Sequence, residues 1–217
     1  MNPFENYRVI DLTKTLESNS PGVHFEQVRT LEKDGWNARE LQLYSHIGTH
    51  MDAPLHFGVN EEGIEKFSPQ RFIAKSWLVK LDEIEAQSLI YPSDMGEIAE
   101  KISAGDNLII RTGWSKIENF QRFRDELPRI SKELAHWIVE KKINLLGVEP
   151  PSVADVNNLA EVTEIHHILM KGDVIIVEGL VNLEKIQSDW VWLIALPLKL
   201  KEGDGSPIRA LAWEPIT

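Results

Sequence analysis

The sequence HIGTHMDAPLH, residues 46–56, decides the interpretation of this chain, because three of the seven histidines of the protein lie within it. An even distribution would place roughly a third of one histidine in a window of this length. A helix would pair His46 with His50, as in zinc peptidases. Gly48 and Pro54 oppose a helix, however, and no Glu follows His46. We therefore expect an extended chain over these residues.

The side chains of an extended chain alternate between two faces, so residues with even numbers share one face of this segment. The ligand-type residues all have even numbers: His46, His50, Asp52 and His56. The apolar side chains between them have odd numbers: Ile47, Met51 and Leu55. Any one of these histidines alone would usually be an ordinary half-buried imidazole. Three imidazoles beside a carboxylate would repel one another when charged and would be costly to bury unpaired, and a divalent cation removes both penalties. We therefore predict a metal site.

A second group of ligand-type residues lies downstream. His166 and His167 fall on a predicted helix, and Glu178 follows the apolar strand 174–177. Adjacent helix positions point about 100° apart, so only one of the two histidines can face a given site. Glu178 taken alone could equally be an ordinary residue at an exposed strand end.

The composition excludes several classes of function. The chain has 34 acidic and 23 basic side chains, a net charge of −11, which leaves no excess of Lys and Arg for binding nucleic acid. It has no Cys, which excludes thiol catalysis, disulfides and Cys-ligated zinc and favours a cytoplasmic protein. The N-terminal residues do not resemble a signal peptide. The longest apolar run, 190–198, contains Pro197 and is far shorter than the roughly 20 residues that span a membrane.

Short β-rich runs recur through the chain and alternate with predicted helices. The predicted strands are 7–12, 40–44, 72–81, 107–112, 144–148, 174–177, 191–196 and 207–212. The predicted helices are 94–102, opened by Asp94 with Glu97, a helix N-capped by Ser131, and 159–170, ended by a left-handed Gly172. No repeat or linker divides the sequence. We expect a single domain, residues 1–217, of the α/β or α+β class.

The motif His-x-Gly-Thr-His-x-Asp-x-Pro-x-His of residues 46–56 resembles the signature of the cyclase family, which includes the bacterial kynurenine formamidases and the isatin hydrolases. The similarity continues in five further blocks, 111–114, 147–152, 166–178, 196–198 and 205–210. The resemblance implies an α/β fold of the swivelling β/β/α type, with mixed sheets and flanking helices. It also implies a homodimer or homotetramer with one or two divalent metals in each active site.

The resemblance also implies roles for individual residues. His46, His50 and Asp52 match the ligands of a first metal. The second metal would be completed by Asp52, His166 and Glu178, and Glu178 could bridge both. His166 is preferred over His167 because the ligand His of the family stands twelve residues before the Glu, as His166 does here. His56 matches the catalytic histidine of the family.

Five candidate metal ligands are too many for a single catalytic zinc, which uses three protein ligands and keeps a fourth position for water. Two ions could share bridging carboxylates, with zinc as the first expectation and manganese as an alternative. One six-coordinate ion such as Mn²⁺ could instead use a subset of the ligands. A divalent ion would activate water for hydrolysis, and His56, with an ordinary pKa near 6.5, is suited to moving protons.

We therefore interpret the chain as a metal-dependent hydrolase of a small amide, with N-formylkynurenine, cut to formate and kynurenine, as the leading substrate. Motifs of serine hydrolases, P-loop enzymes and dinucleotide-binding enzymes are missing. One position departs from the family pattern, because Ser20 stands where formamidases carry an aromatic residue before Pro-Gly. His24 or Phe25 could substitute for it in substrate binding, although His24, like His136, could equally be structural.

Two alternatives remain open at this stage. Isatin, or another cyclic amide or lactone, would be opened by the same chemistry. A metal-binding scaffold without turnover is the alternative from another class, and the presence of His56 beside every ligand argues against it, because a scaffold needs no proton shuttle.

Overall fold

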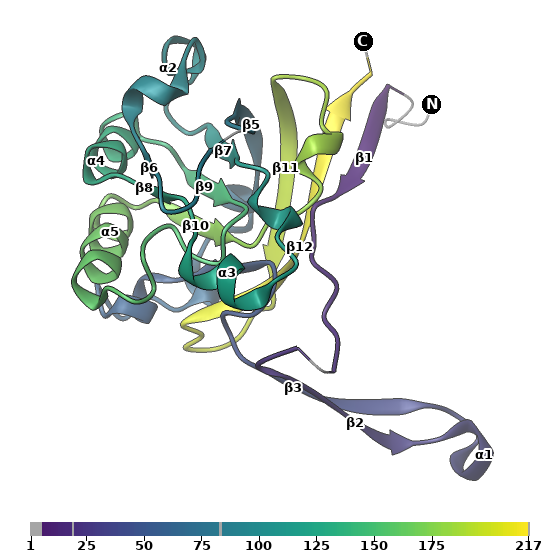
Figure 1. The fold of residues 1–217 in the computed structure, drawn as a ribbon. Coiled ribbons are helices and arrows are strands. Elements are labelled where there is room, and N and C mark those ends of the chain that lie inside the picture. Colours follow the sequence, from purple (N-terminus) through teal and green to yellow (C-terminus); the bar gives the residue numbers. More distant parts are fainter. Residues whose placement is uncertain (1–5, 19, 83, 217) are drawn as a thin grey trace.

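The apolar runs of the sequence form the strands of one large mixed sheet (Figure 1). The computed structural model describes residues 6–18, 20–82 and 84–216. The strands are β1 (Tyr7–Asp11), β2 (Val23–Arg29), β3 (Ala38–Leu43), β4 (His50–Asp52), β5 (Ile73–Lys80), β6 (Leu89–Ile90), β7 (Asn107–Arg111), β8 (Arg129–Ile130), β9 (Leu145–Val148), β10 (Ile175–Glu178), β11 (Trp190–Pro197) and β12 (Gly205–Pro215). The α-helices are α1 (Leu31–Asp34), α2 (Ile98–Lys101), α3 (Phe120–Asp125), α4 (Lys132–Glu140) and α5 (Leu159–Lys171).

The strand order of the large sheet is β1-β12-β11-β5-β7-β9-β10-β4. Strands β5, β7, β9 and β10 are parallel neighbours, and the other pairings are antiparallel. Because β4 pairs with both β10 and β12, the sheet closes on itself as a barrel-like ring. This closure joins the first third of the sequence to its last strand.

Two apolar clusters pack on opposite faces of the parallel strands. One cluster has Met51, Leu145 and Val177 among its members, and the other joins Leu146 and Ile176 to the helices α4 and α5. Every residue of β9 and β10 is buried, as expected for parallel strands covered on both faces. The predicted α/β class, with a mixed sheet and flanking helices, is therefore confirmed.

Most predicted strands are confirmed to within two residues at either end, and the predicted N-cap is also confirmed. The Ser131 hydroxyl accepts a hydrogen bond from the Leu134 amide at 3.0 Å, at the start of α4. The strand predicted to begin at residue 72 begins at Ile73, after a 3₁₀ turn. Strands β2, β6 and β8 were not predicted, because each is exposed or very short. Strand β4 lies within the stretch 46–56 that was expected to be extended.

Two helix predictions were wrong. The segment 94–102 is not one helix, because Asp94 lies in a 3₁₀ turn and Gly96, with φ of 53°, separates it from α2. At the end of α5, Gly172 has φ of −81° and is not left-handed. A side chain there would clash instead, because a Cβ would lie 2.3 Å from Cγ2 of Val139 on α4. Close packing of α4 on α5, rather than backbone conformation, therefore requires glycine at position 172.

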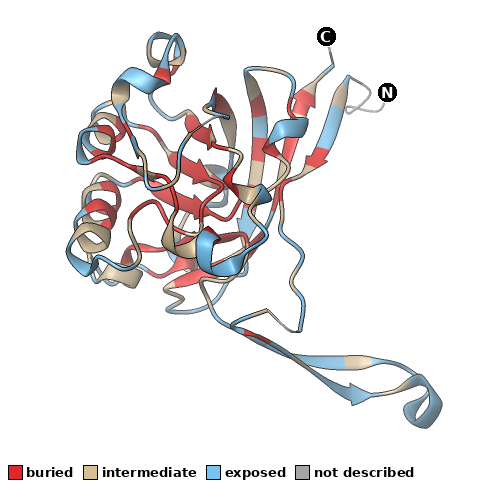
Figure 2. Ribbon diagram, in the orientation of Figure 1, coloured by how far each residue is buried: buried red, intermediate tan, exposed pale blue. Residues whose placement is uncertain are grey.

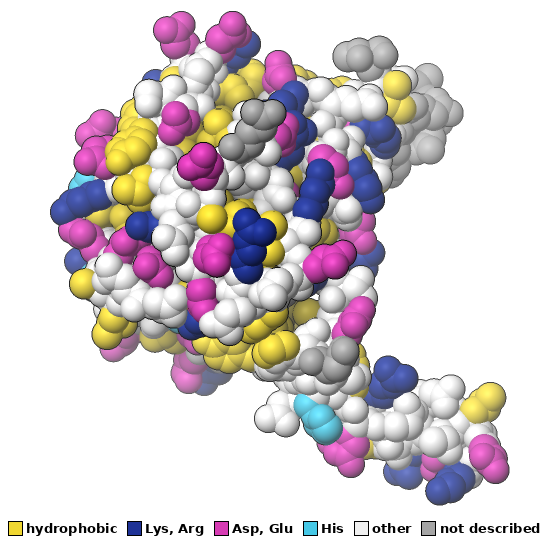
Figure 3. All heavy atoms as spheres, viewed as in Figure 1, with side chains coloured by type: hydrophobic (Ala, Val, Ile, Leu, Met, Phe, Trp, Pro, Cys, Tyr) yellow, Lys and Arg dark blue, Asp and Glu magenta, His cyan; other side chains and the backbone are white. Residues whose placement is uncertain are grey.

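Strands β2 and β3, with α1 between them, form a hairpin that projects from the body of the molecule (Figure 1). We call residues 23–43 the arm. Figure 2 shows nearly all of the arm as exposed, and Figure 3 shows it standing clear of the body with side chains of both charges. Large apolar side chains on it are also exposed, among them Leu31 (65%), Trp36 (57%) and Leu41 (62%). None of the helices in the described residues is both long enough and apolar enough to cross a membrane.

Candidate active site

The short strand β4 brings the first group of ligand-type residues together at the closure of the barrel. His50 and Asp52 lie at its two ends, and His50 is the cross-strand partner of Glu178 on β10. Gly48 makes the turn before β4 with φ of 63°, a conformation that other residues rarely adopt. The turn returns His46 to Asp52, with His46 Nδ1 2.7 Å from Asp52 Oδ1.

The expected convergence occurs, but the expected backbone was wrong. An unbroken extended chain over residues 46–56 is not formed, because strand geometry is confined to His50–Asp52 and His56 lies in the 3₁₀ turn Pro54–Phe57. This turn carries His56 back over the strand, so that its ring stacks on the ring of His46 with centroids 3.7 Å apart.

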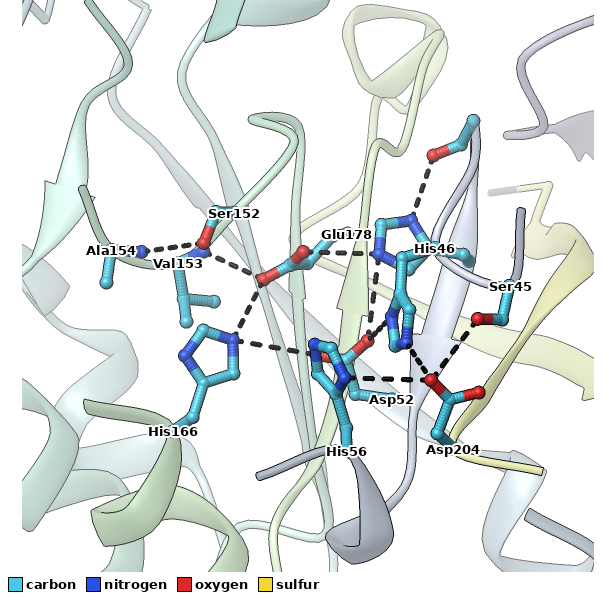
Figure 4. Close-up of polar contacts among 12 residues, drawn as sticks. Ser45, His46, Asp52, His56, Ser152, Val153, Ala154, His166, Glu178 and Asp204 are labelled. Carbon is cyan, nitrogen blue, oxygen red and sulfur yellow. Dashed lines mark hydrogen bonds and ion pairs between the residues drawn. The ribbon is translucent and has the colours of Figure 1, made fainter. Parts of the chain in front are cut away.

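Two buried carboxylates form the centre of the cluster, and both face His50 and His166 (Figure 4). The oxygens of Asp52 lie 3.6 Å from His50 Nε2 and 3.6 Å from His166 Nε2. The oxygens of Glu178 lie 3.3 Å and 3.6 Å from the same two nitrogens. In Asp52 and in Glu178 alike, one carboxylate oxygen faces His50 and the other faces His166. This is the arrangement of carboxylates that bridge two positive centres.

Backbone carbonyls fix the orientation of these two imidazoles. His50 Nδ1 lies 3.1 Å from the Gly48 carbonyl, and His166 Nδ1 lies 2.7 Å from the Val162 carbonyl one helical turn earlier. A carbonyl only accepts, so each Nδ1 carries a proton, and each Nε2 is the nitrogen that faces the carboxylates. Either a proton on Nε2 or a metal ion must then lie between each nitrogen and the carboxylate oxygens. Neutral imidazole nitrogens and carboxylate oxygens are ligands of divalent metals, so the donor set fits a divalent metal.

The electrostatics of the cluster lead to the same conclusion. Burial alone would lower the pKa of His166, but hydrogen bonds with Asp52 and Glu178 outweigh it and raise this pKa to about 10. Burial would likewise raise the pKa of Asp52, and its hydrogen bonds with His166 and His46 instead hold it well below its usual range. The cluster therefore favours positive charge beside its two carboxylates.

On helix α5 the two adjacent histidines have different environments. His166 is buried and faces the carboxylates, whereas His167 Nε2 lies 3.0 Å from the carbonyl of Phe57. The structure thus brings His166 to the cluster and His167 to a backbone carbonyl. All five predicted metal ligands lie together, with His56 beside them.

Asp204 is a member of the site that the sequence did not reveal. Its Oδ2 lies 3.1 Å from His46 Nε2 and 3.8 Å from His56 Nδ1, and it accepts a hydrogen bond from Ser45 (Figure 4). Asp204 precedes β12 and reaches the site because β12 pairs with β4. The only signal in the sequence was its position directly before the block 205–210.

A cavity of about 350 Å³ opens beside the cluster, within the range of small-molecule sites. His46 and His50 form part of its wall, while His56, whose side chain is 25% exposed, is not among the lining residues. Three aromatic side chains also line it: Tyr44, Phe120 and Phe123. The segment Ser20–Gly22 forms another part of the wall.

The two residues predicted to contact substrate lie elsewhere. His24 and Phe25 are on β2 of the arm and do not line this cavity. Tyr44 supplies an aromatic side chain next to the segment where one was expected, because it lines the same cavity as Ser20 and a Cβ on Gly22 would be 3.0 Å from Tyr44 Cβ. The sequence did not point to Tyr44, because it lies 24 positions after Ser20 and comes close to it only where the arm hairpin returns to its base.

Comparisons with known proteins agree with this geometry. A family described as "Putative cyclase" matches residues 10–155. A kynurenine formamidase from Bacillus thuringiensis subsp. konkukian (strain 97-27) is 31% identical over 182 residues, which cover 83% of this chain and 81% of the relative.

Two solved structures share the fold. Isatin hydrolase A from Labrenzia aggregata, bound to benzyl benzoate, superposes with a TM-score of 0.87 at 21% identity and covers 97% of this chain and 94% of that chain. A potential metal-dependent hydrolase with cyclase activity has a TM-score of 0.78 at 23% identity, with coverage of 96% and 98%. At these identities the structural likeness establishes the fold.

Proposed function

This chain belongs to the cyclase family, and we propose that it is a metal-dependent hydrolase of the arylformamidase type, with N-formylkynurenine as its substrate. One observation carries this proposal: Asp52 and Glu178 each offer one oxygen toward His50 and the other toward His166. The curated relative named kynurenine formamidase supports the choice of substrate. The products would be kynurenine and formate.

The proposed metal content is two divalent ions per chain, zinc in the first instance and manganese as the alternative. The first ion would be held by His46, His50 and Asp52, and the second by Asp52, His166 and Glu178. Such ions, when bound, polarise a carbonyl and supply a water activated near neutral pH. The buried imidazole nitrogens and carboxylate oxygens of this cluster are ligand types that zinc and manganese both accept.

The remaining residues would bind the substrate and move its protons. The aromatic side chains of the cavity, Tyr44, Phe120 and Phe123, offer surfaces for an aryl ring beside the cluster. Burial lowers the pKa of His56 from its usual value, and the nearby imidazoles of His46 and His166 lower it further against the opposing effect of Asp52. His56 is therefore a readily deprotonated imidazole, suited to receiving a proton from water and passing it to the departing aryl amine.

A comparison of two substrates tests this function. Metal-loaded enzyme should hydrolyse N-formylkynurenine with kcat/KM of at least about 10⁴ M⁻¹s⁻¹, the lower end for natural substrates, and faster than it opens isatin. Formate release and isatin opening can be followed in parallel. If isatin were opened faster, the substrate would instead be assigned to the class of cyclic amides. Inactivity toward both, with metal bound, would instead favour the non-catalytic scaffold.

We also propose that the chain forms a homodimer or homotetramer through its arm. A two-stranded hairpin without further packing is only marginally stable in water, and this one exposes Leu31, Trp36 and Leu41. A second copy of the chain would cover these side chains. Light scattering should give a multiple of the 24.8 kDa chain mass, and Trp36→Asp should reduce it. A monomeric parent protein would refute this proposal.

The remaining proposals concern partners and location. The acidic net charge supports a small-molecule substrate rather than nucleic acid, and no membrane partner is proposed. The cysteine-free sequence supports a cytoplasmic location, which cell fractionation would test.

A further inference from the structure

The cavity beside the ligand cluster has a charge opposite to that of the protein as a whole. The chain carries a net charge of −11, yet the described residues that line the cavity include Lys14 and Arg124 and no carboxylate. Two cations are about what the composition would place in a lining of this size, so the positive charge of the lining comes from its lack of carboxylates in an otherwise acidic protein. The positive charge of the lining therefore calls for its own explanation.

Lys14 is held close to the ligand cluster by its backbone. Its amide donates a hydrogen bond of 2.8 Å to the hydroxyl of Thr49, the residue directly before His50. Its Nζ lies 4.8 Å from the ring centre of Phe123, a cation–π contact with the cavity wall. Within the described part of the chain, no carboxylate lies within ion-pair distance of this ammonium group. Its charge is thus available to a ligand.

Arg124 provides the second cation, from helix α3. Its Nη1 donates to Asn157 Oδ1 at 3.1 Å and also to Asp125. Both contacts use the same nitrogen, so a guanidinium with five N–H donors keeps others for a ligand, and its side chain is 42% exposed. Asp125 offsets part of the charge of Arg124, which makes Lys14 the stronger of the two cations.

We propose that Lys14 and Arg124 form an anion subsite, which would bind a carboxylate that the aryl amide substrate carries at some distance from its scissile carbonyl. This inference rests on the proposed function and deepens it. The aryl ring would lie against Phe120 and Phe123, the scissile carbonyl would face the ligand cluster, and the carboxylate would meet the two cations. Uncharged cyclic amides such as isatin would leave the subsite unused.

Two formanilides of the same shape test the subsite. One is 4-(2-formamidophenyl)-4-oxobutanoate, and the other is its carboxamide, which differs only in charge. We expect kcat/KM to be about tenfold higher for the acid, through KM rather than kcat, as for a charge-assisted hydrogen bond. Lys14→Met should remove most of this preference, and Lys14→Met with Arg124→Met should remove all of it. Lys101→Met is the matched control, because Lys101 lies on α2 and is paired with Glu97. This variant should keep the preference for the acid.

Direct binding provides a readout that does not depend on turnover. The deformylated acid and its amide can be titrated into the metal-loaded protein by calorimetry. The acid should bind about tenfold more tightly than the amide, and added NaCl should weaken the binding of the acid but not that of the amide. Equal binding of acid and amide, or equal salt dependence, would overturn the subsite. Hydrolysis of neither formanilide, with the acid still bound more tightly, would reject the proposed reaction while supporting the subsite.

Discussion

The raised pKa of His166 predicts an unusual dependence of stability on pH in the metal-free protein. Its pKa is about 10 in the folded protein and near 6.5 in the unfolded chain, so protonation stabilises the fold. This stabilisation is fully present below about pH 6.5 and is lost as the pH rises toward 10. A difference of this size corresponds to about 5 kcal/mol as an upper limit, or at most about 1.4 kcal/mol per pH unit.

Bound metal should oppose this dependence of stability on pH. A divalent ion takes the place of the proton and needs a neutral imidazole, so its affinity rises over the same pH range in which the metal-free protein loses stability. The free energy of unfolding can be measured by urea denaturation between pH 6 and 10, with and without chelator. The metal-free protein should lose stability steeply across this range, and the metal-loaded protein should lose much less.

His166→Asn is the decisive variant in this experiment. It should flatten the decline of the metal-free protein, because the titrating group is gone. His136→Asn is the matched control, since His136 is exposed on α4 and contacts none of the cluster residues. An equally steep decline in His166→Asn and in the parent protein would refute the reasoning.

Three further predictions concern single residues. His56→Ala should lower kcat by about 10²–10⁴ while metal content, measured by elemental analysis, stays intact; loss of metal would make His56 a ligand instead. Asp204→Asn should weaken metal binding by about 10- to 100-fold in a chelator competition, because Asp204 orients His46; unchanged affinity would leave it without that role. Gly172→Ala should lower the free energy of unfolding by about 1–3 kcal/mol, measured in urea, because a Cβ would overlap the stiff side chain of Val139; unchanged stability would show that α4 and α5 can separate.

The ligand cluster was predictable from sequence to the extent that it is local. His46, His50 and Asp52 lie within seven positions, so any backbone that bends once brings them together. Helix geometry alone allowed only one of His166 and His167 to face the site, and the choice of His166, which the structure places at the carboxylates, came from the resemblance to the cyclase family. The backbone conformation between His50 and His56 was not predictable in the same way. The sequence is compatible both with a continuous strand and with the 3₁₀ turn that begins at Pro54.

Features that depend on distant strand pairing could not be predicted. Asp204 enters the site only because β12 closes the barrel against β4, and nothing near Asp204 in sequence indicates this. Tyr44 reaches the cavity because the arm returns it beside Gly22. Of the two strands of the arm, only β3 was predicted. Strand β2 is exposed at most positions and lacks the alternation of apolar and polar residues that identifies a strand.

The bridging role of Asp52 is the central claim, and elemental analysis of dialysed protein tests it most directly. The parent protein should retain two divalent ions per chain. Asp52→Asn should lose most of both, because the amide removes the shared negative charge between His50 and His166. A single ion per chain in the parent protein, or an undiminished content in Asp52→Asn, would contradict the account.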